Sequence, residues 1–82
     1  DVDLQIQPNP VSATGTAVVR FTGPSLQGAT VEVVDILGRV LTKDIWTGAS
    51  AWTLEAEKLQ SGAYFLVVTQ GDARRVARFT VE

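Results

Sequence analysis

The stretch LQSGAYFLVVTQ, residues Leu59 to Gln70, decides the fold of this 82-residue chain. After a Ser-Gly turn its side chains alternate between two faces, one with Tyr64, Leu66 and Val68 and the other with Phe65 and Val67. A period of two is typical of a β-strand, and apolar residues on both faces favour a central strand that is covered on both sides. We therefore predict a central strand from Ala63 to Gln70.

Other short segments repeat this alternation, with clusters of Gly, Pro, Ser and Asn between them. They are a first strand of about five residues around Leu4 and Ile6, then Thr16–Thr22, Ala29–Asp35, Arg39–Lys43, Ala51–Glu55 and Arg74–Val81. Short strands with turns about every ten residues are typical of antiparallel all-β domains. The pattern predicts an immunoglobulin-like Greek-key β-sandwich of about seven antiparallel strands rather than a closed barrel.

Particular residues specify the turns of this sandwich. Pro8-Asn9-Pro10 must end the first strand, because two prolines fix φ and donate no hydrogen bond. In the turn after the third strand, Gly38 is suited to a positive φ and Asp35 can accept backbone N–H bonds. Gly62 is expected to hold a positive φ as well. Tyr64 stands where a tyrosine corner would bond back to an upstream backbone group.

Length and composition limit what the chain can be. A chain of 82 residues is expected to form one domain, 1–82, which buries only roughly 60% of its unfolded surface. Its predicted core contains Phe21, Val33, Leu54, Tyr64, Leu66 and Phe79. No apolar run approaches the ~20 residues of a membrane-spanning helix. The chain begins at Asp1 with no signal peptide, so we interpret it as a piece of a longer secreted protein.

The charge and the missing residue types exclude several functions. A net charge of −2 argues against nucleic acid, since Arg74, Arg75 and Arg78 are too few to bind a phosphate backbone. The absence of Cys excludes disulfides, thiolate zinc sites and thiol nucleophiles. The absence of His excludes ordinary hydrolase triads and the commonest metal ligand. We expect no enzyme and no cofactor.

Acidic residues that could carry chemistry have simpler explanations. Asp35 and Arg39 could form a ligand-binding ion pair, but a turn capped by Asp with an exposed Arg accounts for both. Glu55 and Glu57 fit a solvated rim better than the opposed carboxylates of a glycosidase. Three others lack the dense oxygen spacing of a calcium loop: Asp1, Asp3 and Asp72.

Two tryptophans could instead hold sugar rings, because exposed aromatic faces on small β-sandwiches often do so. Trp52 alternates with Leu54, which favours the core. For Trp46, beside Thr47-Gly48, a core position and an exposed position are about equally favoured. Such a platform normally needs two or three coplanar rings with polar neighbours, which the sequence does not contain.

Taken in order, the turn motifs and the closing strand resemble the type A C-terminal sorting domain of the bacterial type IX secretion system. The matching residues are Pro8, Asn9 and Pro10; Asp35, Gly38, Arg39, Val40 and Leu41; Leu59, Ser61, Gly62, Tyr64 and Phe65; and Arg75, Arg78, Phe79 and Val81. The resemblance covers nearly the whole chain. It departs at the terminus, where such domains often end in Lys and this chain ends in Glu82.

The resemblance implies a non-catalytic export signal at the C-terminus of a cargo protein that an N-terminal signal has already delivered to the periplasm. An outer-membrane translocon would recognise the folded domain, and in many such systems a sortase-like protease then cuts before it. The cargo would end up secreted or at the cell surface.

Two other functions stay open on the sequence alone. One is an accessory carbohydrate-binding or adhesive immunoglobulin-like module of an extracellular enzyme, and the other is a structural domain that stabilises its neighbour. A position at the extreme C-terminus of the full-length protein, behind an unrelated domain, would favour sorting. An internal or repeated position would favour binding or spacing.

Overall fold

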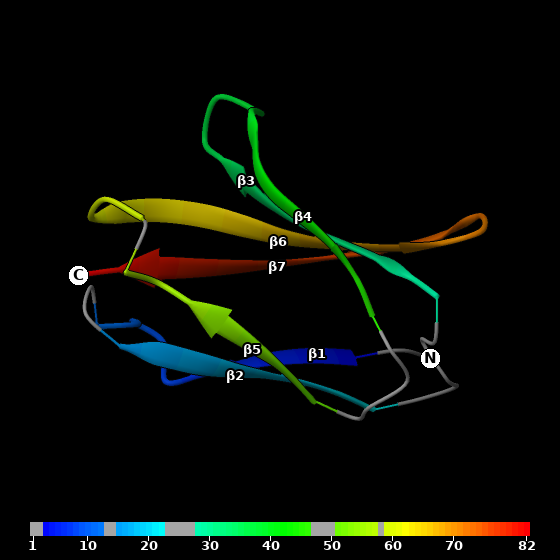
Figure 1. Cartoon of the computed structure of the whole chain (residues 1–82), viewed down its shortest axis with the longest axis horizontal. Helices are drawn as coiled ribbons and strands as arrows, with labels where there is room; N and C mark the ends of the chain where they lie inside the picture. Colours follow the sequence, from blue (N-terminus) through cyan, green and yellow to red (C-terminus); the bar gives the residue numbers. More distant parts are fainter. Residues whose placement is uncertain (1–2, 13–14, 23–27, 47–50, 58) are drawn as a thin grey trace.

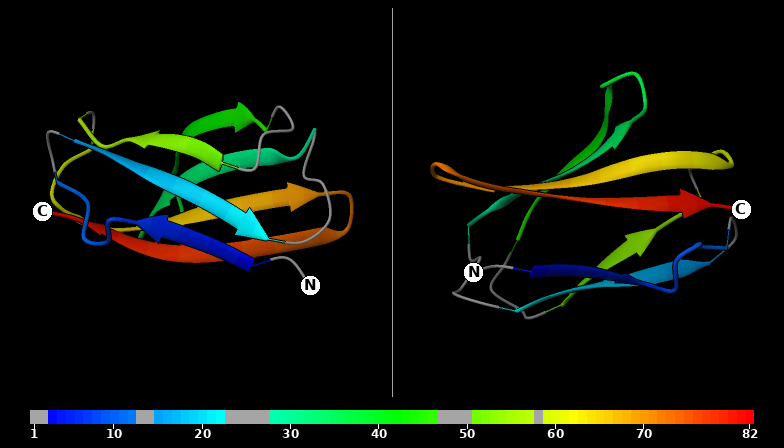
Figure 2. Two further views of the ribbon diagram at one scale, coloured as in Figure 1. Left: turned by 90° about the horizontal axis from the view of Figure 1, so that it is seen from below. Right: turned by 180° about the vertical axis from the view of Figure 1, so that it is seen from behind.

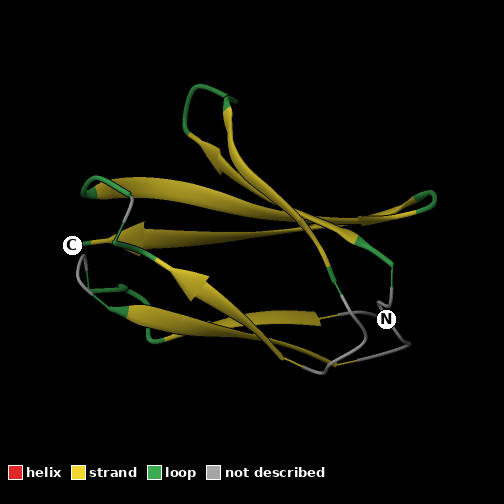
Figure 3. Cartoon of the chain, in the orientation of Figure 1, coloured by secondary structure: helices red, strands yellow, loops and turns green. Residues whose placement is uncertain are grey.

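The computed structural model describes residues 3–12, 15–22, 28–46, 51–57 and 59–82, and every regular element in them is a β-strand (Figure 3). The strands are β1 (Asp3–Gln7), β2 (Thr16–Thr22), β3 (Thr30–Asp35), β4 (Val40–Ile45), β5 (Ala51–Glu55), β6 (Gly62–Gln70) and β7 (Ala73–Val81). All the predicted strands are present. The largest change of boundary is in the fourth, which we predicted at Arg39–Lys43. Nothing in the described residues forms a helix long and apolar enough to cross a membrane.

The strands form two packed sheets, one in the order β1-β2-β5 and the other in the order β4-β3-β6-β7 (Figures 1 and 2). The chain changes sheet between β2 and β3, between β4 and β5, and between β5 and β6. Every strand pairing is antiparallel. The all-β sandwich is therefore confirmed, whereas the detailed immunoglobulin-like Greek-key assignment stays a prediction.

Strand β6 lies in the middle of the four-stranded sheet, as its sequence predicts. It pairs with β3 along one side and with β7 along the other. Tyr64, Leu66 and Val68 are buried on its inner face. On its outer face Val67 is also buried, at 5% exposure, and Phe65 is half-buried. The outer neighbours of Val67 in register are Glu32 and Val76. On this face Val67 is therefore flanked by side chains of its own sheet, whereas the second sheet covers the inner face.

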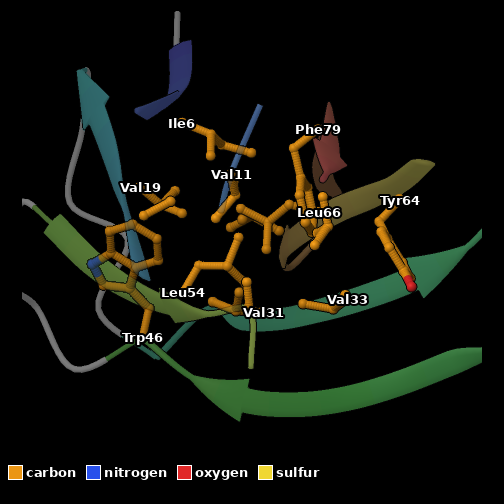
Figure 4. Close-up of a cluster of buried hydrophobic side chains, with 14 of the residues drawn as sticks. Ile6, Val11, Val19, Val31, Val33, Trp46, Leu54, Tyr64, Leu66 and Phe79 are labelled. Atoms are coloured by element: carbon orange, nitrogen blue, oxygen red, sulfur yellow. The ribbon is translucent and has the colours of Figure 1, made fainter. Parts of the chain in front are cut away.

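The core fills the space between the sheets, with Trp46 at one end of the cluster and Tyr64 at the other (Figure 4). The expected core residues Val33, Leu54, Tyr64, Leu66 and Phe79 are buried, and Phe21 is half-buried against the cluster. Trp46 is 1% exposed and packs edge to face with Phe21, at 5.4 Å between ring centroids. Trp46 is therefore a core residue and cannot present a ring face to a sugar. Trp52 is half-buried and packs on the same cluster.

The turn before β6 has the predicted tyrosine corner. The Tyr64 hydroxyl donates a hydrogen bond to the Gln60 carbonyl at 2.5 Å, while its ring stacks on Phe79 at 5.6 Å. Leu59 N–H donates to Ala56 O at 2.9 Å, so the chain makes one tight turn just before this corner. Gly62 has a φ of +152°, which confirms the need for glycine there.

Phe79→Ala tests the core at the strand that ends the chain. Phe79 is fully buried, and its removal should cost about 3 to 5 kcal/mol of the free energy of unfolding through lost burial and a residual cavity. Val76→Ala on the same strand, where the side chain is 53% exposed, should change it by less than about 0.5 kcal/mol. Chemical denaturation measures both. Equal midpoints for the two variants would contradict this core.

Candidate recognition surface

The turn between β3 and β4 is organised by the Asp35 carboxylate. One carboxylate oxygen accepts the N–H groups of Leu37 and Arg39, each at 2.9 Å, and the other accepts Arg39 Nε at 2.7 Å. Gly38 has a φ of +85°, and its N–H donates to Asp35 O at 3.0 Å. A Cβ at Gly38 would contact nothing within 4 Å, so only backbone conformation requires glycine here. The turn predicted from the sequence is confirmed.

The same hydrogen bonds set the protonation of Asp35. The backbone N–H of Arg39 contributes most to lowering the pKa of this carboxyl below its ordinary value of 3.8, and partial desolvation opposes it. The Arg39 guanidinium and the Leu37 N–H lower the pKa further. The Asp35 side chain is 11% exposed and that of Arg39 is 72% exposed, so the ion pair belongs to the turn and leaves the guanidinium in solvent. This favours the structural interpretation of the pair.

The turn at Asp35–Arg39 and the corner at Leu59–Tyr64 meet, although nineteen residues lie between them in the sequence. Together with Leu41 they line a surface pocket of about 540 Å³. They meet because β3 and β6 are paired so that Asp35 lies opposite Tyr64. The side chains of Ile36 and Leu37 at the turn are 69% and 75% exposed.

The Pro8-Asn9-Pro10 turn binds the last strand. Asn9 accepts the Thr80 N–H at 3.1 Å through Oδ1 and donates to Arg78 O at 3.2 Å through Nδ2. Its side-chain amide thus takes the place of a peptide group on the outer edge of β7. Both Gln7-Pro8 and Asn9-Pro10 are cis peptide bonds.

Val11 continues this contact with its own backbone. Its N–H donates to Thr80 O at 2.7 Å, and its carbonyl accepts the Glu82 N–H at 2.9 Å. The result is a parallel bridge between Val11 and Val81, and both side chains are buried. Asn9 and Val11 therefore occupy the edge of the C-terminal half of β7. Sequence analysis missed this role, for which the one available signal was an apolar residue directly after the two prolines.

All four motif segments consequently gather at one end of the four-stranded sheet, which we name the motif end: Pro8–Val11, Asp35–Arg39, Leu59–Tyr64 and Arg78–Glu82. Asp35, Tyr64 and Phe79 lie side by side across three strands. Phe65 and Arg78 are paired on the outer face in the next row. Arg75 lies further along β7, exposed, and its Nη1 donates to Arg74 O at 3.0 Å. In the described residues no cluster of acidic side chains is suited to a metal ion.

This convergence agrees with a match to a known family. The model of the secretion system C-terminal sorting domain matches residues 5–82, which is nearly the whole sequence. The chain belongs to this family. Sorting domains of the family are C-terminal signals of the type IX secretion system, are in general non-catalytic, and serve secretion to the cell surface or beyond.

A solved structure supports the fold independently. The sorting domain resembles part of PorZ, an essential bacterial surface component of the type IX secretion system of Porphyromonas gingivalis, with a TM-score of 0.78 at 20% sequence identity. The alignment covers 96% of this chain but only 11% of that one, so the chain spans about a ninth of that protein. No curated protein matches the sequence.

Asn9 of the sorting domain offers a test of the contact with β7. Asn9→Ala should lower the free energy of unfolding by about 1 kcal/mol for each of its two hydrogen bonds. Relative to the unmutated domain, deuterium exchange should speed up more at the Thr80 amide than at the amides of β2. Asn9→Asp keeps the acceptor for Thr80 and loses the donor to Arg78, so it should destabilise the domain while Thr80 stays protected. Unchanged Thr80 exchange in Asn9→Ala would contradict the contact.

Asp35 gives the domain a pH dependence whose sign is fixed. Its folded pKa is depressed, so its charged form contributes stability above the unfolded pKa of about 3.8, and this contribution is lost as pH falls through the folded pKa. Asp35→Asn should lack this part of the acid-side loss. Thermal melts of both proteins between neutral pH and pH 2 measure the difference; two parallel curves would show that Asp35 does not contribute in this way.

Proposed function

We propose that this domain, attached behind a cargo protein, directs that cargo from the periplasm across the outer membrane by the type IX secretion system and performs no chemistry itself. Membership in the sorting-domain family carries this proposal. The proposal includes one folded domain over residues 1–82, docking to an outer-membrane translocon, and removal by a sortase-like protease that cuts before the domain.

The gathering of the family motifs at one end supports recognition of a folded surface. Residues as distant in sequence as Asn9 and Thr80 are joined by hydrogen bonds there. Several motif side chains form hydrogen bonds with the backbone: Asp35 closes a turn, and Asn9 holds the last strand. We therefore assign docking to residues that are exposed at the motif end, including Arg78, and to Arg75 further along β7.

The competing sugar-binding function loses its best residue, because Trp46 is buried against Phe21. Trp52 is half-buried with its neighbours in the core cluster, so the two rings do not form an exposed platform. No observation favours this second function, and we do not propose it.

Fusion of the domain behind a periplasmic reporter, in a host with a type IX system, tests the proposal. The intact fusion should appear outside the cell. Removal of residues 75–82 should abolish this, because it removes most of β7, including Phe79 and Val81, from the core and leaves β6 an open edge. Fractionation of cells and medium followed by reporter assay measures export.

A double variant separates docking from folding. Arg75→Ser with Arg78→Ser changes two exposed side chains and should alter the free energy of unfolding by less than about 1 kcal/mol. Export that falls while the melt is unchanged would place docking at these arginines. A parent fusion that stays periplasmic in a host exporting its own cargo of this type would show the sorting assignment to be wrong.

A further inference from the structure

One side of the sandwich, between β4 and β5, is left open among the described residues. Every residue of β4 is exposed, although every second side chain of an ordinary sandwich strand is buried. Within the described residues β4 pairs only with β3, and β5 pairs only with β2. Figure 1 shows the β3–β4 hairpin rising away from the second layer.

A groove runs along this open side. The pocket at the motif end is followed by a second pocket of about 330 Å³, and both include Leu59. In the second pocket one wall is Thr42–Asp44 of β4 and the other is Trp52–Glu55 of β5. We name these two pockets together the β4–β5 groove. Leu59 and the half-buried Trp52 give it an apolar lining.

The β4 edge beside the groove has backbone groups directed away from β3. Trp46 N–H donates to the carbonyl of Ala29, the residue just before β3, so the backbone N–H of Trp46 points to the β3 side of β4. Backbone groups alternate in direction along an antiparallel strand. The N–H and C=O groups of Thr42 and Asp44 therefore also point to β3, while those of Lys43 and Ile45 point outward. Ile45 N–H is bonded at 2.8 Å to the Asp44 carboxylate, as this alternation requires. The outward N–H and C=O of Lys43 face no described strand.

The apolar surface of the molecule is concentrated on the same hairpin. Of the six large apolar side chains that the described residues leave exposed, five belong to the β3–β4 turn or to β4: Ile36, Leu37, Val40, Leu41 and Ile45. Exposed apolar side chains gathered on one hairpin mark an interaction site more often than single residues scattered over a surface do.

Charge and area decide what fits the groove. Asp35 is paired with Arg39, and Lys43, Asp44 and Glu55 are of mixed sign, so no strongly charged partner is favoured. A strand of six residues is about 20 Å long and one strand wide. The area that a single added strand of this length covers is smaller than the ~800 Å² that each partner buries in a stable complex. The small area favours a transient partner over a second copy of this chain.

We propose that the β4–β5 groove receives an extended, uncharged segment of the export machinery, which adds as a strand to the β4 edge at Lys43 and places alternate apolar side chains over Leu59 and Trp52. Backbone hydrogen bonds supply the affinity of such strand addition, and the pockets for alternate side chains supply the specificity. This inference rests on the proposed function, since the partner is part of the export machinery.

Lys43→Pro and Lys43→Ala, compared in the reporter fusion, test the backbone contact. Both remove the ammonium group, but only proline removes the outward N–H, and an edge strand tolerates proline where its N–H faces solvent. Export of Lys43→Pro should be about tenfold or more below that of Lys43→Ala, which corresponds to about 1.4 kcal/mol of binding. Melts of the two isolated domains establish that both fold.

Leu41→Ser and Val76→Ser test the apolar contact, and they decide the matter if the proline variant does not fold. Leu41 is 43% exposed and lines the groove, whereas Val76 is 53% exposed on β7 and lines neither pocket. Export of Leu41→Ser should be several-fold lower than that of Val76→Ser.

The possible results separate this inference from the proposed function. If the parent fusion is exported and neither pair differs, the groove proposal is wrong and the sorting function stands. If the parent is not exported, both are wrong. If sedimentation shows a wild-type dimer that Lys43→Pro turns into monomers, the occupant is a second copy and the proposed partner is wrong.

Discussion

The pairing of β6 with both β3 and β7 is the constraint on which the rest of this structure depends. It places Tyr64 between Asp35 and Phe79, and thereby sets the β3–β4 turn and the end of β7 beside the corner that begins β6. The hydrogen bond from Tyr64 to Gln60 fixes where β6 starts. Because a shift of one residue would reverse the faces of the strand, the buried positions of Leu66 and Val68 hold this register.

The two edges of the four-stranded sheet are treated differently. At β7, Asn9 and Val11 satisfy backbone groups of the C-terminal half. At β4, the Asp44 carboxylate satisfies only the N–H of Ile45, and the hairpin carries exposed aliphatic side chains. Exposed edges invite association, so proteins usually cover or charge them. One edge of this small sheet is covered, and no described residue pairs with the other; this contrast is the physical basis for placing a transient partner at β4.

The motif residues serve mainly to shape the backbone. Asp35 and Gly38 specify one turn, Gly62 and Tyr64 specify another, and Asn9 binds the last strand through a side-chain amide. A sorting signal that is recognised as a folded surface, as we propose, needs a reproducible surface before it needs any reactive group. The exposed fraction of neighbouring residues such as Leu37 follows from these turns, because backbone bonds hold the turn without any need to bury its side chains.

The sequence by itself determined the strands, the turns and most of the core, because period-two alternation, proline and glycine act locally. It predicted the cap at Asp35, the positive φ of Gly38 and the corner at Tyr64, each of which involves residues at most a few positions apart. It left Trp46 undecided, because a residue at a strand end shows no alternation, and burial against Phe21 comes from another sheet. Only the tertiary structure decided that Asn9 and Val11 cover β7, that distant turns share one pocket, and that β4 stands away from β5. Those contacts join residues far apart in the chain, so their geometry depends on the register and packing of whole sheets and not on any local pattern.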